Sequence, residues 1–319
     1  MTIITFANII MASTTSDFKR IYTGEGDVSS VQQVTEKKAV ESNKKIIFKR
    51  FMKHKPAVVS TILLTLMILA AVFAPVIARF DPNLITADFE AAPSAVYWLG
   101  TDGVGRDVFS RVIHGARVSL FVGVSSVAIY TLIGTTLGLI AGYYGGKVDG
   151  FIMRLTEIVQ SFPSFMVVLV LVSIIGSGVG KLALILGLLN WVPLSRIVRG
   201  NVLTIKDSDY IQAAVSVGYS TPHILFKEIL PNVLGSIFIN ATFGIASAIL
   251  TESSLSFLGM GIQPPTASWG NILSQAQSLT VLSSQPWLWI PAGLMILTAV
   301  LAINFIGDGL RDAFDGTSN

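Results

Sequence analysis

The sequence predicts an all-α polytopic membrane protein with six transmembrane helices. Three observations predict this fold class. Hydrophobic residues make up 52% of the 319 residues and charged residues only 13%, about half the roughly 25% found in a typical soluble domain. The mean hydropathy is +0.68. The charged residues are also separated by several long uncharged runs, which mark the spans of a membrane protein.

Each span is predicted from an uncharged run that can cross a bilayer of roughly 30 Å at about 1.5 Å per helical residue. The fourth run is short, and it reaches full length only if the helix continues past Arg196 and Arg199, whose side chains extend to the membrane surface. The alternative is a re-entrant hairpin over 163–195. Two spans are preferred, because an odd total would place the two large polar segments on opposite sides. The predicted spans are residues 56–78, 118–146, 158–180, 182–203, 229–251 and 287–307.

Basic residues near the span ends predict the orientation. Residues 1–56 contain ten Lys and Arg residues, whereas residues 79–116 contain three, against five Asp and Glu residues. The N-terminus is therefore expected in the cytoplasm, and six spans return the C-terminus to the same side. The expected organisation is a flexible cytoplasmic segment at 1–48, a six-helix transmembrane domain at 49–316 and a tail at 317–319.

The residues within the spans indicate how the helices pack and argue against one class of transporter. Gly134, Gly138 and Gly142 place a small residue at every fourth position of the second span, which lets another helix backbone approach closely. Almost no charged side chain lies deep inside a span. A proton-coupled secondary transporter usually carries Asp, Glu or His there. This absence and the lack of a visible inverted repeat argue against that class.

No catalytic or metal-binding motif is visible. The chain has no cysteine, which excludes disulfides, thiolate zinc sites and iron–sulfur clusters, and its three histidines lie far apart. Residues 176–182 resemble a phosphate-binding loop, but Ile175 stands where the first glycine is required and Leu182 where Ser or Thr is required. We interpret this segment as a helix–helix turn. We therefore expect no enzyme activity, metal or cofactor in this chain.

The most informative polar segment is 207–232, between the fourth and fifth spans. Its first residues can cap a short helix that Gly218 ends in a left-handed conformation. Pro222 can open a second short helix, which is expected to end at Leu230, just before Pro231. Two short helices nearly at right angles are the predicted result, at about 207–229.

The first of these helices carries Ala213 and Ala214, whose small side chains suit insertion into a partner's groove. From spacing alone, an ordinary amphipathic interfacial loop explains the segment equally well.

Residues 253–286 carry no charge, which is unusual for a loop in water, and their glycines and prolines prevent much regular helix. Irregular backbone near membrane depth is tolerated where it is buried in protein or lines a cavity. We predict that residues 257–269 fold back toward the interior as part of an outer gate, with Glu252, paired or hydrogen-bonded, at its root. The alternative is a surface lid, with Glu252 at a helix end in water. The gate candidates are Glu252, Phe257, Gly259, Gly261, Pro264, Pro265 and Trp269.

The polar segment 207–232 resembles a known motif. Gln212-Ala213-Ala214, with Gly218 four residues after the second alanine and Leu230-Pro231 twelve residues further on, resembles the EAA-type coupling motif of ATP-binding-cassette importer permeases. The segment departs from that pattern by having Gln212 at the usual Glu and Glu228 where Ile is common. The Gly hinge and the alanine pair are both present.

Three further stretches resemble the dipeptide/oligopeptide/nickel permeases of that superfamily. They are LGTDGVGRDVFSR at 99–111, LTESSLSFLGMGIQPP at 250–265 followed by SWG, and GDGLRDAFD at 307–315. Together with the coupling motif, they extend the resemblance over roughly 49–316. The run GTDxxGRD is typical of the second of the two permease subunits in such systems. This outer signature consists of Gly100, Thr101, Asp102, Gly105, Arg106 and Asp107.

The resemblance implies the six-helix fold of a type I importer permease in the bacterial cell (inner) membrane. A second homologous permease would complete a heterodimer around the pathway, two cytoplasmic ATPase subunits would bind ATP and Mg, and an extracytoplasmic binding protein would deliver substrate. No nucleic-acid partner is implied. This chain would form half of the pathway and one coupling element, whose residues are Gln212, Ala213, Ala214, Gly218, Leu230 and Pro231.

The substrate stays open within this family. Peptides are preferred on family frequency, whereas nickel, a metal chelate or an opine are the alternatives. A non-transporting scaffold or a passive channel is the alternative from another class, and it would assemble or conduct without an ATPase partner. A membrane-embedded enzyme is a third possibility, for which no cluster of reactive residues is present.

Overall fold

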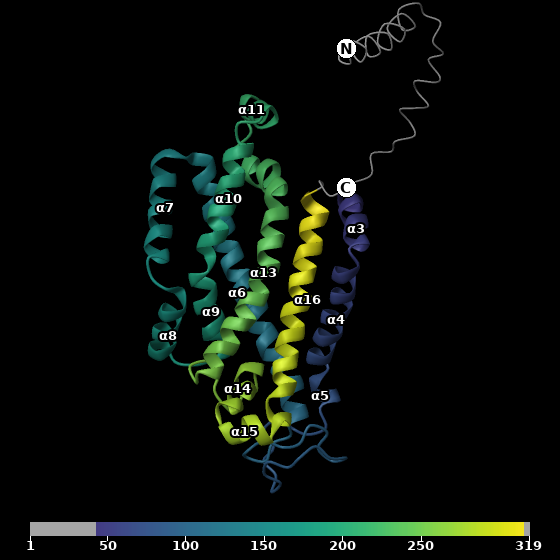
Figure 1. Cartoon of the computed structure of the whole chain (residues 1–319). Coiled ribbons are helices and arrows are strands. Elements are labelled where there is room, and N and C mark those ends of the chain that lie inside the picture. The colour runs from purple at the N-terminus through teal and green to yellow at the C-terminus, as the bar shows by residue number, and fades with distance from the viewer. Residues whose placement is uncertain (1–42, 316–319) are drawn as a thin grey trace, which may run out of the picture. The chain divides into compact units, whose positions relative to one another are not determined.

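The computed structural model describes residues 43–315, which form helices joined by turns and loops, with one isolated β-bridge between Thr101 and Asp107 (Figure 1). By its internal contacts the chain divides into two units, Met1–Lys49 and Arg50–Asn319. Of the first unit, the described part is the beginning of α3 (Asn43–Lys53). The predicted segment 1–48 lies mostly outside the described residues, and the predicted tail lies entirely outside them.

Five helical segments of the second unit are long and apolar enough to cross a membrane, and a bent pair supplies a sixth when it is taken as one span. The all-α class is thus confirmed, and the predicted count of six is reached with the bent pair taken as one span. The bent pair is α7 (Gly146–Gln160) and α8 (Ser164–Ile175), which meet at 78°. The others are α4 (Lys55–Val72), α6 (Val108–Tyr144), α9 (Val179–Leu189) with α10 (Trp191–Ile205), α13 (Leu230–Phe257) with the turns before it, and α16 (Ile290–Asp315).

The third span differs from its prediction as a single helix over 158–180, because α7 and α8 are separate helices. Pro163 has no N–H and disfavours the helical conformation of the residue before it, so the helix breaks there. The pair also begins earlier than the uncharged run. Asp149 in the first turn of α7 forms an ion pair with Arg199 of α10, and a paired charge does not end a helix.

The second span also starts earlier than predicted, at Val108 instead of residue 118. Asp107 caps this helix, because its carboxylate accepts a hydrogen bond from the Ser110 N–H at 2.8 Å. Arg111 lies inside the helix and is only 3% exposed. The positions of charged residues therefore predict the start of this helix poorly, because tertiary contacts accommodate the charged side chain of Arg111 within it.

The fourth span is an interrupted rod in which α9 and α10 are separated at Asn190, and it reaches full length at Ile205. The re-entrant alternative over 163–195 is not adopted. Arg196 in this rod donates from Nε and Nη2 to the Thr156 hydroxyl of α7, at 3.3 and 3.1 Å.

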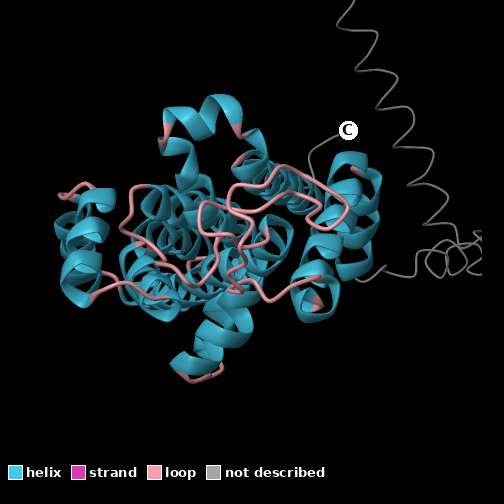
Figure 2. Ribbon diagram, turned by 90° about the horizontal axis from the view of Figure 1, so that it is seen from below, coloured by secondary structure: helices cyan, strands magenta, loops and turns pink. Residues whose placement is uncertain are grey.

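The helix α6 packs against α4, α9, α10 and α13, while α16 packs against α13 and α4. Figure 2 views these helices end-on, with the loops of one end crossing over them. The glycines of α6 pack against α10. A Cβ at Gly138 would lie 2.6 Å from the carbonyl oxygen of Ser195, and one at Gly142 would lie 2.6 Å from the Cβ of Val202. The predicted glycine ridge for close helix approach is confirmed.

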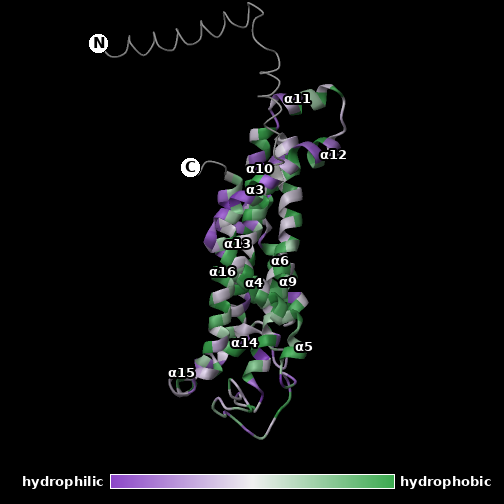
Figure 3. Ribbon diagram, turned by 90° about the vertical axis from the view of Figure 1, so that its right-hand side faces the viewer, coloured by the Kyte–Doolittle hydropathy of each residue, from purple (hydrophilic) through white to green (hydrophobic). Residues whose placement is uncertain are grey.

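Two sets of short elements lie at opposite ends of the long helices (Figures 1 and 3). In Figure 3 the long helices are largely hydrophobic, and hydrophilic residues gather near α12. One end carries α11 (Asp209–Ser216) and α12 (Thr221–His223). The other carries α5 (Ala74–Ile77), α14 (Trp269–Leu273), α15 (Leu279–Ser284) and the 3-10 turns Ser274–Gln277 and Pro286–Leu288.

Candidate functional site

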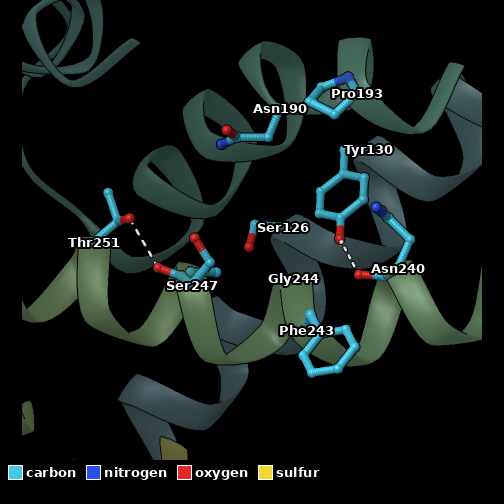
Figure 4. Close-up of a pocket in the computed structure, with 10 residues that line it drawn as sticks. Ser126, Tyr130, Asn190, Pro193, Asn240, Phe243, Gly244, Ser247 and Thr251 are labelled. Carbon is cyan, nitrogen blue, oxygen red and sulfur yellow. Dashed lines mark hydrogen bonds between the residues drawn. The ribbon is translucent and has the colours of Figure 1, made fainter. Parts of the chain in front are cut away.

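A polar cavity of about 230 Å³ lies between α6, the α9–α10 rod and α13 (Figure 4). By residue number it lies near the middle of both α6 and α13. No charged side chain lines it. Its polar lining residues are Ser126, Tyr130, Asn190, Asn240, Ser247 and Thr251.

The cavity depends on a close approach between α6 and α13. The Tyr130 hydroxyl donates to the backbone carbonyl of Asn240 at 3.2 Å. Gly244 makes room for this ring, because a Cβ there would lie 1.6 Å from the Tyr130 oxygen. The cavity can therefore offer hydroxyl and amide groups to a polar ligand, but no charge.

None of the residues that line this cavity is among the site residues predicted from the sequence. The signal that could have found it is the spacing of small and polar residues in the fifth span. Asn240, Gly244, Ser247 and Thr251 follow one another at intervals of four, three and four, which places them on one face of a helix. Polar residues inside a span face a protein interior or a water-filled cavity.

The helix α11 ends as the sequence predicts, at a left-handed glycine. Gly218 has φ +87°. The N–H of Tyr219 donates to the carbonyl of Ala214 at 3.1 Å, and the N–H of Gly218 donates to that of Val215 at 3.0 Å. These two bonds form a Schellman motif, which satisfies the last carbonyls of the helix.

The two alanines of this helix differ in exposure. Ala213 and its neighbour Gln212 are exposed, whereas Ala214 is only 8% exposed and packs inward. Ala214 therefore serves mainly to seat α11 on the molecule, contrary to the expectation that both alanines face a partner. The exposed face is instead widened by apolar side chains at either end of α11, at Tyr210, Val215, Val217 and Tyr219.

The second short helix is not separate, in contrast to its prediction. From Thr221 the chain continues through α12 and a π-helical turn, Ile224–Ile229, directly into α13. In that turn the N–H of Leu230 donates to the carbonyl of Leu225. Pro231 follows at the start of α13, where its missing N–H and its ring fit the widened turn. Leu230 and Pro231 thus lie within a continuous helical path from Thr221 to Phe257, which connects the predicted coupling helix to the fifth span.

The outer signature forms the folded loop that precedes α6. Asp102 is 1% exposed and accepts hydrogen bonds from the backbone N–H of Val104 at 3.0 Å and of Arg106 at 2.9 Å. The Arg106 Nε also donates to it, at 2.8 Å. Gly105 has φ +81° and lies where a Cβ would meet the Thr86 carbonyl oxygen at 2.4 Å. This loop is therefore built around one buried carboxylate.

The remaining signature residues also have structural positions. Gly100 has φ +70°, and a Cβ there would lie 2.3 Å from the Ala91 carbonyl oxygen. Thr101 donates to the carbonyl of Asp88. Arg111, just after the signature, has its Nε 3.6 Å from Asp102 and donates from Nη1 to the Pro265 carbonyl at 3.4 Å. Arg111 therefore bridges the outer signature and the candidate gate.

Glu252 lies at the root of the candidate gate and is 0% exposed. Its Oε2 accepts a hydrogen bond from the Ser119 hydroxyl at 2.9 Å, and its Oε1 accepts one from the Ser256 hydroxyl at 2.8 Å. The Ser119 oxygen in turn accepts from the Trp269 N–H at 3.2 Å, and the Ser256 oxygen from the Ile262 N–H at 3.0 Å. Two points of the loop, Ile262 and Trp269, are thus each joined to one carboxyl group through a serine.

The loop between α13 and α14 alternates between packed and exposed stretches: it is buried at 261–262 and 267–268 and exposed at 258–259 and 263–266. A Cβ at Gly261 would lie 2.5 Å from the Ser256 nitrogen, so this glycine rests on the end of α13. Trp269 is 0% exposed, and its Nε1 donates to the Val112 carbonyl of α6 at 3.1 Å. The exposed gate candidates are Gly259, Pro264 and Pro265, while Phe257 is half-buried.

Within the described part of the chain, no group of three or more His, Asp or Glu side chains could hold a metal ion.

The comparisons with known proteins agree with one another. Residues 134–317 match the family described as binding-protein-dependent transport system inner membrane component. Residues 42–94 match the N-terminal transmembrane domain of oligopeptide transport permease C.

Curated relatives cover most of this chain. The chain is 41% identical to the oligopeptide transport system permease protein OppC of Bacillus subtilis (strain 168), over 83% of this chain and 87% of that protein. It is 40% identical to the dipeptide transport system permease protein DppC of Alkalihalophilus pseudofirmus, over 84% and 88%. It is 39% identical to the glutathione transport system permease protein GsiD of Pectobacterium atrosepticum, over 87% and 92%.

Proposed function

The chain belongs to the family of binding-protein-dependent transport system inner membrane components, and on that premise we propose that it forms half of the pathway of an ATP-driven peptide importer. It is an integral inner-membrane transport permease. In the proposed importer, a second homologous permease completes the pathway, two ATPase subunits bind ATP and Mg, and an extracytoplasmic binding protein delivers the peptide. Both termini are then cytoplasmic, and the ATPases contact the end that carries α11.

The polar cavity between α6, the α9–α10 rod and α13 is the observation that carries this proposal. A polar cavity near the middle of membrane-spanning helices is costly unless it faces a polar ligand or water. Its hydroxyl and amide groups match the hydrogen-bonding pattern of peptide groups. The absence of charge in its lining allows peptides with different side chains to pass.

A peptide is the substrate that the relatives favour, since the three reported relatives are named for oligopeptide, dipeptide and glutathione transport. A nickel complex, a metal chelate or an opine is the alternative. The described residues provide no cluster of metal ligands that would favour nickel itself.

The coupling segment supports the ATPase contact. Its exposed face carries Ala213 beside Val217 and Tyr219, which are 73% and 48% exposed. Apolar side chains exposed at a polar end of the molecule indicate an interaction surface. The continuous connection from this segment through Pro231 into α13 lets a movement of the segment reach the cavity lining.

The test is purification of the tagged full-length chain from its membrane, followed by assays of ATP hydrolysis and uptake. We expect a nucleotide-binding subunit to co-purify and ATP-dependent uptake of labelled dipeptide or tripeptide. Ala213→Asp should abolish peptide-stimulated ATP hydrolysis, because it buries an unpaired charge in the contact. Ser283→Asp, an equally exposed position on α15 at the other end, is the matched control.

Purification without an ATPase would favour the scaffold or passive channel. Uptake of a nickel chelate in preference to peptides would overturn the substrate class and leave the permease function intact.

We also propose that residues 257–269 form part of the outer gate, held shut by the hydrogen bonds that reach Glu252 through Ser119 and Ser256. Ala267→Cys reports on the opening of this gate, because Ala267 is only 5% exposed in the closed loop. This cysteine should react slowly with a membrane-impermeant maleimide in the resting protein and faster when ATP is trapped. Thr266→Cys, an exposed neighbour, should react fast in both states. Equal, nucleotide-independent rates at 267 would show that the loop is a surface lid.

A further inference from the structure

The break between α7 and α8 leaves an apolar groove of about 240 Å³ against the end of α9. Ser164 is the single polar residue of its lining. The groove faces outward, since Ile158 and Phe162 at its edge are each 59% exposed. Its other lining residues are Val159, Val167 and Leu189.

The groove lies on an apolar surface. Most side chains exposed further along α8 are apolar, among them Met166, Val170 and Ile174. The exposed polar one is Ser173, whose hydroxyl donates to the Leu169 carbonyl of the same helix at 2.8 Å. Apolar cavities stay dry, and one of ~150 Å³ already holds benzene. Within a bilayer, a groove of this size is therefore filled by a hydrocarbon chain or by the side chains of another protein.

One arginine beyond the groove, Arg196, lies on the α9–α10 rod and contacts α7. Arg196 donates from Nε and Nη2 to the Thr156 hydroxyl. Thr156 precedes the lining residue Val159 by about one helical turn, or roughly 4.5 Å along α7. On the α9–α10 rod, Arg196 follows Leu189 by about 10 Å. Both helices thus place the guanidinium on the same side of the groove, toward the end that carries α11.

The charge of Arg196 has no counterpart in the described part of the chain. The neighbouring ion pairs are complete: Arg199 pairs with Asp149, and Arg154 pairs with Glu157 at 2.7 Å. Arg196 makes no ion pair with a described carboxylate, and its side chain is exposed. It lies about 26 Å along the rod from Val179, which is near the edge of a hydrocarbon core of roughly 30 Å.

We propose that this site binds one anionic phospholipid, with an acyl chain in the groove and the phosphate on Arg196. The positions of the two groups match those of a lipid's headgroup and acyl chain, because the guanidinium lies at the membrane edge and the groove lies deeper. A guanidinium binds a phosphate through paired hydrogen bonds. An anionic headgroup is favoured over a zwitterionic one, because the ammonium of the latter would find no free carboxylate among the groups named above.

A lipid is favoured over the second permease as the occupant. The polar cavity is lined by α6, the α9–α10 rod and α13, whereas α8 packs against α9 (Figure 1). The face with polar groups is the one that a pathway shared by two permeases requires, and the apolar α7–α8 face is suited to lipid. The lipid site does not depend on which substrate is transported.

The test uses the full-length chain, purified with the subunits that remain bound, and phosphatidylglycerol that carries a photoreactive group on one acyl chain. Irradiation should label the peptide that contains residues 158–167. Arg196→Gln should weaken this labelling about tenfold, as expected for the loss of one charge-assisted contact. Val167→Trp, which fills the groove and leaves Arg196 in place, should abolish it.

Arg154→Gln is the matched control, because Arg154 is equally basic, lies on α7 and is 81% exposed; it should label as the wild type does. The corresponding phosphatidylcholine should label about tenfold more weakly, and inorganic phosphate should not compete. Equal labelling by both lipids and all variants would show only the ordinary lipid shell and overturn the site. Absence of labelling, with crosslinks from residue 158 to a partner protein instead, would also overturn it.

Discussion

At the residue scale, glycine decides where helices approach one another and where they end. Gly244 and Gly218 illustrate the two cases. A side chain at Gly244 would collide with the Tyr130 hydroxyl. A side chain at Gly218 would meet no atom within 4 Å but would have to adopt φ +87°. The first glycine is required by packing and the second by backbone conformation.

The packing role of Gly244 gives a testable prediction. Gly244→Ala should displace the Tyr130 ring into the cavity and lower the transport rate severalfold, since overpacking costs about 1–3 kcal/mol. Combining it with Tyr130→Phe removes the closest atom and should restore part of the rate. Uptake measurements on the two single variants and the double variant check this. Independent, additive losses would contradict the proposed contact.

The backbone role of Gly218 gives another. Gly218→Val forces a β-branched residue into the left-handed region, at a cost of about 1–2 kcal/mol or more. The end of α11 should then distort, and substrate-stimulated ATP hydrolysis should fall while membrane insertion stays normal. Gly200→Val is the control, because Gly200 is helical and a Cβ there meets nothing within 4 Å. Normal stimulation in Gly218→Val would refute the coupling role of this helix end.

At the element scale, pairs of helices are held by different means. The contact between α6 and α10 depends on close backbone approach, whereas α7 and α10 are joined by polar contacts such as Asp149 with Arg199. The loop after α13 is held by the serine-mediated hydrogen bonds to Glu252.

The α6–α10 contact can be tested directly. Gly138→Leu should destabilise the protein by about 1–3 kcal/mol or more, because even a Cβ would lie 2.7 Å from the Cβ of Val198. Unfolding in mixed micelles with increasing sodium dodecyl sulfate measures the effect. Gly180→Leu, where a Cβ meets nothing within 4 Å, should change stability little. A similar loss in both variants would mean that the ridge does not determine the packing.

At the scale of the whole molecule, the two polar ends carry different machinery. One end carries α11 and its exposed apolar residues, and the other carries the outer signature and the loop at Glu252. The polar cavity lies between them, among the long helices. In the proposed importer, the first end would contact the ATPase and the second would open to the outside.

The orientation of these ends can be predicted and measured. A cysteine at position 88, in the outer loop, should react with a membrane-impermeant reagent in intact cells. A cysteine at position 217, beside α11, should react only after the membrane is made permeable. The native chain contains no cysteine to interfere. The reverse pattern would place the N-terminus outside and exclude an ATPase contact at α11.

The sequence by itself determined the helical class, the number of spans, the left-handed turn at Gly218 and the glycine ridge of α6. These features follow from hydropathy, periodicity and backbone conformation, which act over a few neighbouring residues. The EAA-type spacing and the outer signature likewise indicated the family, because they are patterns along the chain.

Only the tertiary structure decided how distant residues meet. In the folded chain, Ala214 packs inward and the helical path continues through Pro231 into α13. The third span breaks before Pro163, and Arg111 lies inside α6. The tertiary structure also joins Ser119 to Glu252 and Tyr130 to Asn240, more than a hundred residues apart in the chain. The physical reason is that the burial of a charge or a small side chain depends on which atoms surround it, and those atoms come from other helices.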